Sequence, residues 1–402
     1  MRQEKLGQHP VETTSESFES LGLDDGILKS VRKVGFLHPT PIQSAVIPPA
    51  LEGRDIIGLA QTGSGKTAAF VIPIASRLLH GKGLRGLIIC PTREIALQTK
   101  AFLDLFGKYH GLATTCVIGG VKMGPQIREL KKGPDIVVAT PGRLVDHLGR
   151  KNVRLGDIEE LVLDEADHML DLGFLPQLRK IMARVPDRRH TMMFSATMPS
   201  AIERLARQYL SDPIRIDILP QGRAAEGIDH RLYMVEDSHK RKCLLALLHQ
   251  ELGSTLVFTR RKLDADWLCR VLEKEGHPVT NIHSDRTQQQ RTKALEGFRK
   301  GSHRILVATN IAARGLDIAG IQHIINFDIP QTAEEYIHRA GRTARMDAHG
   351  LVSTIATWLD KEMVKTIEET IQQELPRCTV AGVPPYVETK AQPFRKRRKS
   401  HW

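Results

Sequence analysis

Short runs of aliphatic and β-branched residues alternate with longer amphipathic stretches along this chain of 402 residues. Continuous apolar runs between helical stretches are typical of parallel strands that are covered by helices on both faces. A helix is predicted over 361–375, where five apolar residues from Met363 to Leu375 fall on one face. The clearest predicted strands are GLIIC (86–90), DIVVAT (135–140), ELVLD (160–164), TMMFSA (191–196), TLVF (255–258), RILVAT (304–309) and HIINF (323–327).

The alternation is interrupted once, at 212–227, where prolines and glycines occur without helical periodicity. It then restarts, so the pattern predicts two α/β domains in tandem, as the length of the chain also favours. The predicted division is an N-terminal lead (1–17), a first domain (18–212), a linker (213–227), a second domain (228–375) and a short basic tail (376–402).

Composition narrows the class of protein. The chain is 41% hydrophobic and 26% charged, as in a globular protein. No apolar run approaches the roughly 20 residues of a membrane helix, and the polar N-terminus lacks a signal-peptide core. Five scattered cysteines argue against a disulfide framework or a zinc site and favour a reducing, cytoplasmic location.

Charge suggests a polyanionic partner. The net charge is +12, and residues 390–402 supply six Lys or Arg and no acid. A basic tail of this kind is either a solvated chain end or a nucleic-acid contact, and composition leaves both readings open.

A phosphate-binding turn is predicted at Ala60-Gln61-Thr62-Gly63-Ser64-Gly65-Lys66-Thr67, between an apolar strand and a helix. Such a turn points backbone N–H groups at an anion, and the helix dipole adds to the attraction. Lys66 would reach the β- and γ-phosphates and Thr67 would offer its hydroxyl to Mg²⁺. Ala60 stands where the strict pattern has glycine, and GSGKT alone could be an ordinary turn.

Three carboxylates follow the apolar strand LVL (161–163), within the sequence DEADH (164–168). Charged side chains are seldom buried without partners, and acids also favour the first turn of a helix. In a chain with a phosphate loop, Asp164 is expected to hold Mg²⁺ through water and Glu165 to orient or deprotonate the attacking water. Together the two motifs predict a nucleoside triphosphatase.

With AQTGSGKT and DEAD both present, the sequence resembles a DEAD-box ATP-dependent RNA helicase of superfamily 2, from Phe18 to about residue 357. The compact length and the ARGLDI wording are most similar to the bacterial RhlE-like subgroup. The resemblance implies two tandem RecA-like domains, each a parallel β-sheet flanked by helices. The ordered matches are PTPIQ (39–43), PTREIAL (91–97), TPGR (140–143), SAT (195–197), LVFTRRK (256–262), HSDRTQQQR (283–291), ATNIAARGLDI (308–318) and HRAGRTAR (338–345).

The resemblance implies a role for each motif. Phe18 and Gln43 would bind adenine, although Gln43 by itself reads as a polar residue at a helix start, and Asp317 would lie near the ribose. Arg342 and Arg345 would face the γ-phosphate, and Asp167, Ser195 and Thr197 would couple hydrolysis to strand separation. His168 could share the contact of Asp167 with the other domain. The implied phosphate contacts are Thr62, Gly63, Ser64, Gly65, Lys66 and Thr67, and the implied RNA contacts are Pro91, Thr92, Arg93, Gly120, Thr140, Gly142, Arg143, Gln288, Arg291, Thr309 and Gly315.

Four positions depart from the family pattern and put fine RNA contacts in doubt: Arg261, Ser284, Asn310 and Ala344. The expected activity is RNA-stimulated ATP hydrolysis with local, non-processive unwinding, by a monomer. The expected partner is RNA, and ribosome-assembly and RNA-decay proteins are the candidate protein partners. A DNA helicase of the same superfamily is one alternative, which ATPase stimulation by DNA would favour. An ATP-dependent RNA clamp that barely unwinds is the other, because the same motifs serve both.

Overall fold

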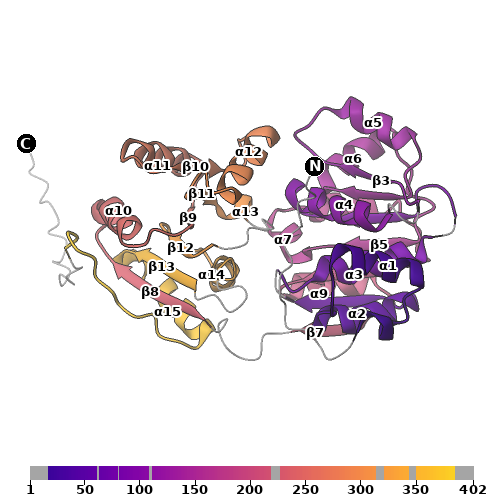
Figure 1. The fold of residues 1–402 in the computed structure, drawn as a ribbon, viewed down its shortest axis with the longest axis horizontal. Coiled ribbons are helices and arrows are strands. Elements are labelled where there is room, and N and C mark those ends of the chain that lie inside the picture. Colours follow the sequence, from indigo (N-terminus) through magenta and orange to yellow (C-terminus); the bar gives the residue numbers. More distant parts are fainter. Residues whose placement is uncertain are drawn as a thin grey trace, which may run out of the picture.

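The computed structural model describes residues 17–60, 63–79, 81–107, 111–218, 227–313, 321–343 and 350–384. These residues form two lobes, each built on its own sheet (Figure 1). Within these ranges the structure has no helix that is both long enough and apolar enough to cross a membrane.

The first sheet is parallel throughout, as the apolar runs predict. Successive residues of one strand enter opposite cores: Ile88 packs on one face and Leu87 on the other. In sheet order its strands are β3 (Thr114–Val117), β4 (Ile136–Ala139), β2 (Gly86–Ile89), β5 (Glu160–Leu163), β6 (His190–Ser195), β1 (Ile56–Ala60) and β7 (Ile214–Ile218).

Helices cover both faces of this sheet and close a core on each (Figure 1). One face carries η1 (Phe18–Leu21), α1 (Asp25–Val34), α2 (Pro41–Leu51), α3 (Lys66–Arg77) and α4 (Arg93–Gly107). The other helices of this lobe are α5 (Met123–Lys131), α6 (Pro141–Gly149), α7 (Ala166–Asp171), α8 (Leu175–Met182) and α9 (Ser200–Tyr209).

The second sheet repeats the architecture, with parallel strands and a core on each face. Its strands, in sheet order, are β10 (Val279–Ile282), β11 (Ile305–Thr309), β9 (Thr255–Thr259), β12 (His323–Asn326), β13 (Gly350–Ala356) and β8 (Ile228–Met234). The helices of this lobe are η2 (Asp237–His239), α10 (Lys240–Gln250), α11 (Lys262–Lys274), α12 (Gln288–Arg299), α13 (Asn310–Ala313), α14 (Ala333–Ala340), η3 (Trp358–Asp360) and α15 (Lys361–Ile371). The fold class predicted from the sequence is thus confirmed.

Two predicted boundaries need correction. Residues 213–218, expected in the linker, include β7, which pairs along the whole of β1 and extends the first domain to Ile218. The start of the expected tail also belongs to a domain, because Pro376 and Cys378 exchange backbone hydrogen bonds with Leu232 of β8. The lead 1–16 and the basic residues 385–402 lie outside the described residues.

Candidate nucleotide and RNA site

The phosphate loop follows β1 and ends at the start of α3. Gly63 and Gly65 have φ of 91° and 95°, a region that favours glycine. A Cβ on Gly65 would also stand 2.5 Å from Nε2 of Gln43, so the loop excludes a larger residue there. Ser64 and Thr67 are described beside them, whereas Thr62 lies outside the described residues.

Lys66 is the first residue of α3, and its side chain turns back into the loop. Only 7% of the residue is exposed, and Nζ donates to the carbonyl oxygen of Ala60 at 2.6 Å. A buried ammonium held by one carbonyl remains a donor with two further protons. The arrangement therefore leaves a cation aimed into a loop of bare amides, as a phosphate requires.

Gln43 supports this loop from α2. It forms a capping box with Thr40, in which Oε1 accepts from the Thr40 N–H at 3.0 Å. Nε2 donates to the carbonyl of Gly65 at 3.1 Å, and Thr40 Oγ1 donates to the carbonyl of Ser64 at 2.8 Å. The helix-start reading of Gln43 is therefore correct, and its amide retains one proton and one lone pair for a further partner.

Phe18 lies in the core of the first domain. It is 2% exposed and stacks on Phe36, with ring centroids 6.1 Å apart. In this arrangement Phe18 anchors η1 against Phe36, which follows α1, and a base would have to displace this packing to stack on Phe18.

Asp164 and Glu165 stand side by side at the carboxyl end of β5. Burial and the neighbouring Glu165 raise the pKa of Asp164. Burial also acts to raise the pKa of Glu165, but a hydrogen bond from His168 and the positive charges of His168, Lys66 and Arg342 outweigh it and hold that pKa low. A buried carboxyl whose pKa is raised in this way gains from a nearby cation.

The backbone at Glu165 is strained. Its φ is 49°, in the left-handed region that non-glycine residues rarely occupy, and it caps the start of α7. Strain of this kind costs about 1–3 kcal/mol and persists where the surrounding structure enforces it, often at functional sites.

Asp167 joins α7 to the loop after β6. Its Oδ2 accepts from the backbone N–H groups of Ala196 and Thr197 and from the Thr197 hydroxyl, each at 3.1 Å. Its own N–H donates to Ser195 Oγ at 3.3 Å. The three predicted coupling residues therefore meet, but the hydrogen bonds described for Asp167 stay within the first domain, whereas the expectation was a contact with the second.

The second domain brings Arg342 toward these carboxylates, since its charge acts on Glu165. Arg342 is 5% exposed and follows α14. The preceding Arg339, which the sequence reading did not select, is buried and fixes this turn: it donates to Asn326 Oδ1 and to the carbonyl of Asp328, both at 2.9 Å, and pairs with Glu335. Arg345, Asp317 and Gly315 lie outside the described residues, as does Ala344.

The predicted RNA residues of the first domain gather at strand ends. Arg93 approaches Gly120 so closely that a Cβ there would lie 1.9 Å from its guanidinium. Arg143 donates to the carbonyl of Val121 at 3.0 Å. Pro91 and Thr92 precede α4, Thr92 accepts from the N–H of Ile95 at 3.3 Å, and Thr140 and Gly142 stand at the start of α6.

A cluster of arginines spans the two domains here. The pKa of Arg93 is lowered by burial and then by the charges of Arg291 and Arg143, against the opposing effect of Glu94. Three guanidinium groups that repel one another favour a polyanion between them.

Glu94 bridges the domains and was missed by the sequence reading. It is 7% exposed and pairs with Arg291 at 2.7 Å, while Gln288 Nε2 donates to it at 3.1 Å. Both partners are on α12 and were predicted to bind RNA. Nothing in the sequence links Glu94 to residues about 200 positions away, so only the structure reveals this contact.

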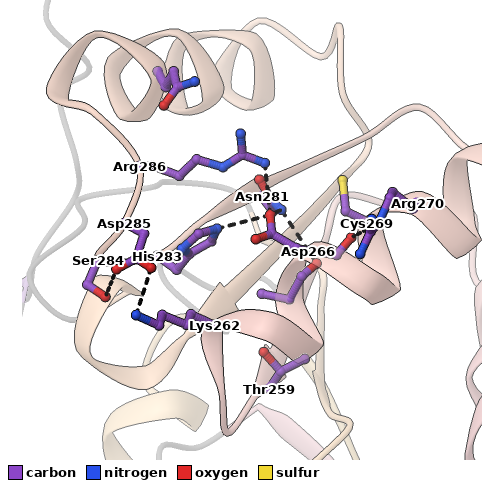
Figure 2. A network of polar contacts seen from close by, with 12 residues as sticks. Thr259, Lys262, Asp266, Cys269, Arg270, Asn281, His283, Ser284, Asp285 and Arg286 are labelled. Carbon is purple, nitrogen blue, oxygen red and sulfur yellow. Dashed lines mark hydrogen bonds and ion pairs between the residues drawn. The ribbon is translucent and has the colours of Figure 1, made fainter.

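The loop that precedes α12 is held by Asp266 of α11 (Figure 2). One oxygen, Oδ1, accepts from Asn281 Nδ2 at 2.8 Å, from Arg286 at 3.0 Å and from His283 Nε2 at 3.1 Å. Burial acts to raise the pKa of Asp266, but the hydrogen bonds from His283 and Asn281 and the charges of His283 and Arg286 outweigh it. Asp266, too, was not a sequence candidate.

The departures from the family pattern find local partners. Arg261 forms a two-pronged pair with Asp264 at 2.8 and 2.9 Å. Figure 2 shows Ser284, whose Oγ donates to Asp285 at 3.3 Å. Asn310 begins α13, directly after Thr309 at the end of β11. All five cysteines are free thiols.

A glycine loop at a helix start, with a buried lysine and paired carboxylates two strands away, defines a nucleotide-binding α/β protein whose site receives an arginine from a second domain. The chain belongs to the DEAD-box family of ATP-dependent RNA helicases. Residues 40–205 match the DEAD/DEAH box helicase model and residues 239–347 match the helicase conserved C-terminal domain. It is therefore an ATP-hydrolysing enzyme that unwinds or remodels RNA.

Individual relatives agree with this assignment. The chain is 42% identical to the DEAD-box ATP-dependent RNA helicase CshA of Bacillus cereus, over 90% of this chain and 69% of that protein. It is 44% identical to the ATP-dependent rRNA helicase RRP3 of Eremothecium gossypii, over 90% and 76%. The structure of Dbp5 from S. cerevisiae bound to RNA and ADP BeF3 superposes with a TM-score of 0.80 at 29% identity, over 90% of this chain and 96% of that one.

Proposed function

We propose that ATP binds between the two lobes, with its phosphates in the loop after β1. Thr62, Gly63, Ser64, Gly65, Lys66 and Thr67 would hold the phosphates, Gln43 and Phe18 the adenine, and Asp317 the ribose. The observation that carries the proposal is that the positive charges of Lys66 and Arg342 both lower the pKa of Glu165, although these two residues come from different domains. Half of the site thus comes from each lobe.

The residues present fit Mg²⁺. Mg²⁺ is usually held by one or two carboxylates together with substrate phosphates. Asp164 is a buried carboxylate whose pKa is raised, and Thr67 places a hydroxyl in the first turn of α3. These two residues would hold the ion, Asp164 through water, and the ion would neutralise charge on the phosphates.

Hydrolysis then depends on three groups of this chain. Glu165 accepts a proton from the attacking water. Arg342 and Arg345 stabilise the charge that develops on the γ-phosphate, an effect worth about 10³–10⁵ in rate in related phosphoryl-transfer enzymes. Since Arg342 and Arg345 belong to the second domain, hydrolysis requires the lobes to be closed.

RNA would lie across both lobes and favour that closure. Its backbone would contact Pro91, Thr92, Arg93, Gly120, Thr140, Gly142 and Arg143 in the first domain and Gln288, Arg291, Thr309 and Gly315 in the second. The arginine cluster around Arg93 supports this path. The movement of Asp167, Ser195 and Thr197 would link the state of the nucleotide to the RNA.

Unwinding by closure on one strand is local and non-processive, and the protein acts as a cytoplasmic monomer. The basic tail after residue 385 would add affinity for RNA that depends on salt. We also place the chain in the bacterial RhlE-like subgroup on its ARGLDI wording; the relatives compared above carry other names. Since the similar RRP3 protein is called an rRNA helicase, ribosome-assembly factors are partners to test, as are RNA-decay proteins.

The test is Glu165→Gln, which keeps the size of the side chain and removes the base. We expect RNA-stimulated kcat to fall by about 10²–10⁴ while the affinities for ATP and RNA stay within twofold. Glu159→Gln is the control, since this exposed acid lies just before β5, and it should retain wild-type turnover. Strand displacement on short RNA and DNA duplexes measured beside ATPase separates unwinding from clamping. Wild-type turnover by Glu165→Gln would contradict the role of Glu165.

A further inference from the structure

We propose that His168 is a positioning residue that holds the Glu165 carboxylate in place for the attacking water. The proposal rests on the role of Glu165 proposed above. It rests equally on an observation that this role does not use, the contact between these two side chains within one turn of α7.

The contact is direct and sheltered. His168 Nδ1 lies 3.1 Å from Glu165 Oε2, and the two residues are three apart on the chain. His168 is 4% exposed, and the Glu165 side chain is 13% exposed. A sheltered hydrogen bond to a carboxylate competes little with water and is roughly twice as strong as one between neutral groups.

The chemistry of the two groups fixes the direction of the bond. An ionised carboxylate only accepts, so Nδ1 carries the proton and donates it. Nε2 is buried, and no residue that the structure describes offers it an acceptor. The proton on Nδ1 is thus matched by the Glu165 carboxylate, and this contact carries the proposal.

Glu165 needs such a restraint. Its backbone is in the strained left-handed region, where the side chain leaves the strand end at an unusual angle. The bond from His168 occupies Oε2 and leaves Oε1 to meet a water molecule. A misplacement of about 1 Å at a catalytic group costs on the order of 10²-fold in rate, so a modest restraint has a large effect on turnover.

His168 is itself anchored to the coupling residues. Its backbone N–H donates to Asp167 Oδ1 at 2.9 Å, while Asp167 Oδ2 accepts from the loop at residues 196–197. The backbone of His168 is therefore held by the same carboxylate that accepts hydrogen bonds from the loop after β6. A shift of that loop would be transmitted through His168 to Glu165.

Three substitutions at His168 test the hydrogen bond apart from packing. His168→Leu replaces the imidazole with an apolar side chain of similar length and removes the hydrogen-bond donor. His168→Asn places an amide N–H near the position of Nδ1, and His168→Gln places one near Nε2, where Glu165 does not lie. For His168→Leu and His168→Gln we expect kcat of the RNA-stimulated ATPase to fall by about 10–100-fold, with KM for ATP and the Kd for RNA within twofold.

His168→Asn should stay within about threefold of the wild-type kcat, because it restores the donor. If His168 only fills space, kcat should fall at least as far in His168→Asn as in His168→Leu, since Asn is the smaller and more polar replacement in a buried site. Equal losses of kcat in His168→Asn and His168→Leu would overturn the proposal. Thermal unfolding of each variant shows whether the fold is retained, and the comparison between Asn and Gln remains decisive even where stability falls.

Combination with Glu165→Gln separates this proposal from the role of Glu165. If His168 acts through Glu165, adding His168→Leu to Glu165→Gln causes no further loss in single-turnover hydrolysis. If Glu165→Gln is inactive while His168→Leu turns over at the wild-type kcat, the proposal for His168 fails and the role of Glu165 stands. If Glu165→Gln itself turns over normally, the role of Glu165 fails first.

Discussion

The two sheets of this protein have the same strand order, but the residues that follow corresponding strands differ in their chemistry. Six strands occupy the same positions in the same chain order: β3-β4-β2-β5-β6-β1 in the first domain and β10-β11-β9-β12-β13-β8 in the second. By this correspondence β8 takes the place of β1, and β12 takes the place of β5. A lysine opens the next α-helix in both domains, Lys66 after β1 and Lys240 after β8.

The second lysine has no phosphate to bind. Lys240 Nζ pairs with Asp328 at 2.6 Å, at the end of β12, and lies 4.7 Å from the ring centre of Phe327. The segment between β8 and α10 holds no glycine, so it makes no cradle of amides. A pocket of 430 Å³ remains, whose lining combines the acids Asp237, Asp264, Asp328 and Asp360 with the bases Lys240, Arg260 and Arg261.

The comparison teaches that the strand order provides the place for a site and the loop decides its use. In the first domain, Gly63 and Gly65 let the chain turn around Lys66, so that its ammonium can meet a ligand in the loop. In the second, Asp328 pairs with the lysine, and no glycine turn forms around it. In the proposed mechanism the second domain therefore supplies Arg342 to a shared site instead of forming a nucleotide site of its own.

The largest expected effect is the contrast between Lys66→Ala and Lys240→Ala. Lys66→Ala should lower RNA-stimulated kcat by about 10²–10³, because a buried cation at the phosphates is lost. Lys240→Ala should keep ATP turnover within a few-fold and instead destabilise the second domain. The loss should be about 3 kcal/mol, since Asp328 would keep a partly buried charge without its partner.

Steady-state ATPase and urea unfolding of both variants measure this contrast. A loss of ATP affinity in Lys240→Ala with an unchanged unfolding curve would show that the second pocket is used by nucleotide. The double variant with Asp328→Asn should recover much of the stability, because it removes the unpaired charge as well.

The next effect concerns the contact that joins the lobes, Glu94 with Arg291. A double-mutant cycle with Glu94→Ala and Arg291→Ala should give a coupling energy of about 2 kcal/mol in kcat/KM for RNA, since both groups are buried at the junction. The exposed pair Lys100–Asp104 on α4 is the matched control and should couple by less than about 0.5 kcal/mol. Coupling as weak as that of the control would mean that the lobes do not close through Glu94.

These contacts also show which parts of the fold and of the site the sequence alone predicts. Buried parallel strands such as GLIIC and ELVLD were predictable because both faces are covered, and the functional motifs begin at their ends. The flanking prolines and glycines predict a linker where β7 lies, although its alternating IRIDI pattern is that of a half-exposed edge strand.

The missed residues share a different cause. Glu94 and Asp266 gain their roles from partners that only the fold brings near, across the lobes in one case and from helix to strand end in the other. Gln43 was ambiguous because one amide serves the capping box and the phosphate loop together. Local pattern identifies chemistry at strand ends, but pairing between distant segments has no local signal.

The smallest expected effect is a loss of stability of the second domain as the pH falls. His323, at the start of β12, is buried beside Ser353, and burial together with the charges of Arg231 and Arg304 lowers its pKa to about 4. The unfolded chain binds a proton there near pH 6.5 and the folded domain does not, so stability is full above pH 6.5 and declines as pH falls toward 4. By pH 5 the loss should be about 2 kcal/mol.

His323→Gln keeps a polar partner for Ser353 and cannot titrate. The free energy of unfolding of the second domain should therefore differ less between pH 7 and pH 5 in this variant than in wild type. An equal difference in both proteins would assign the acid sensitivity to other groups.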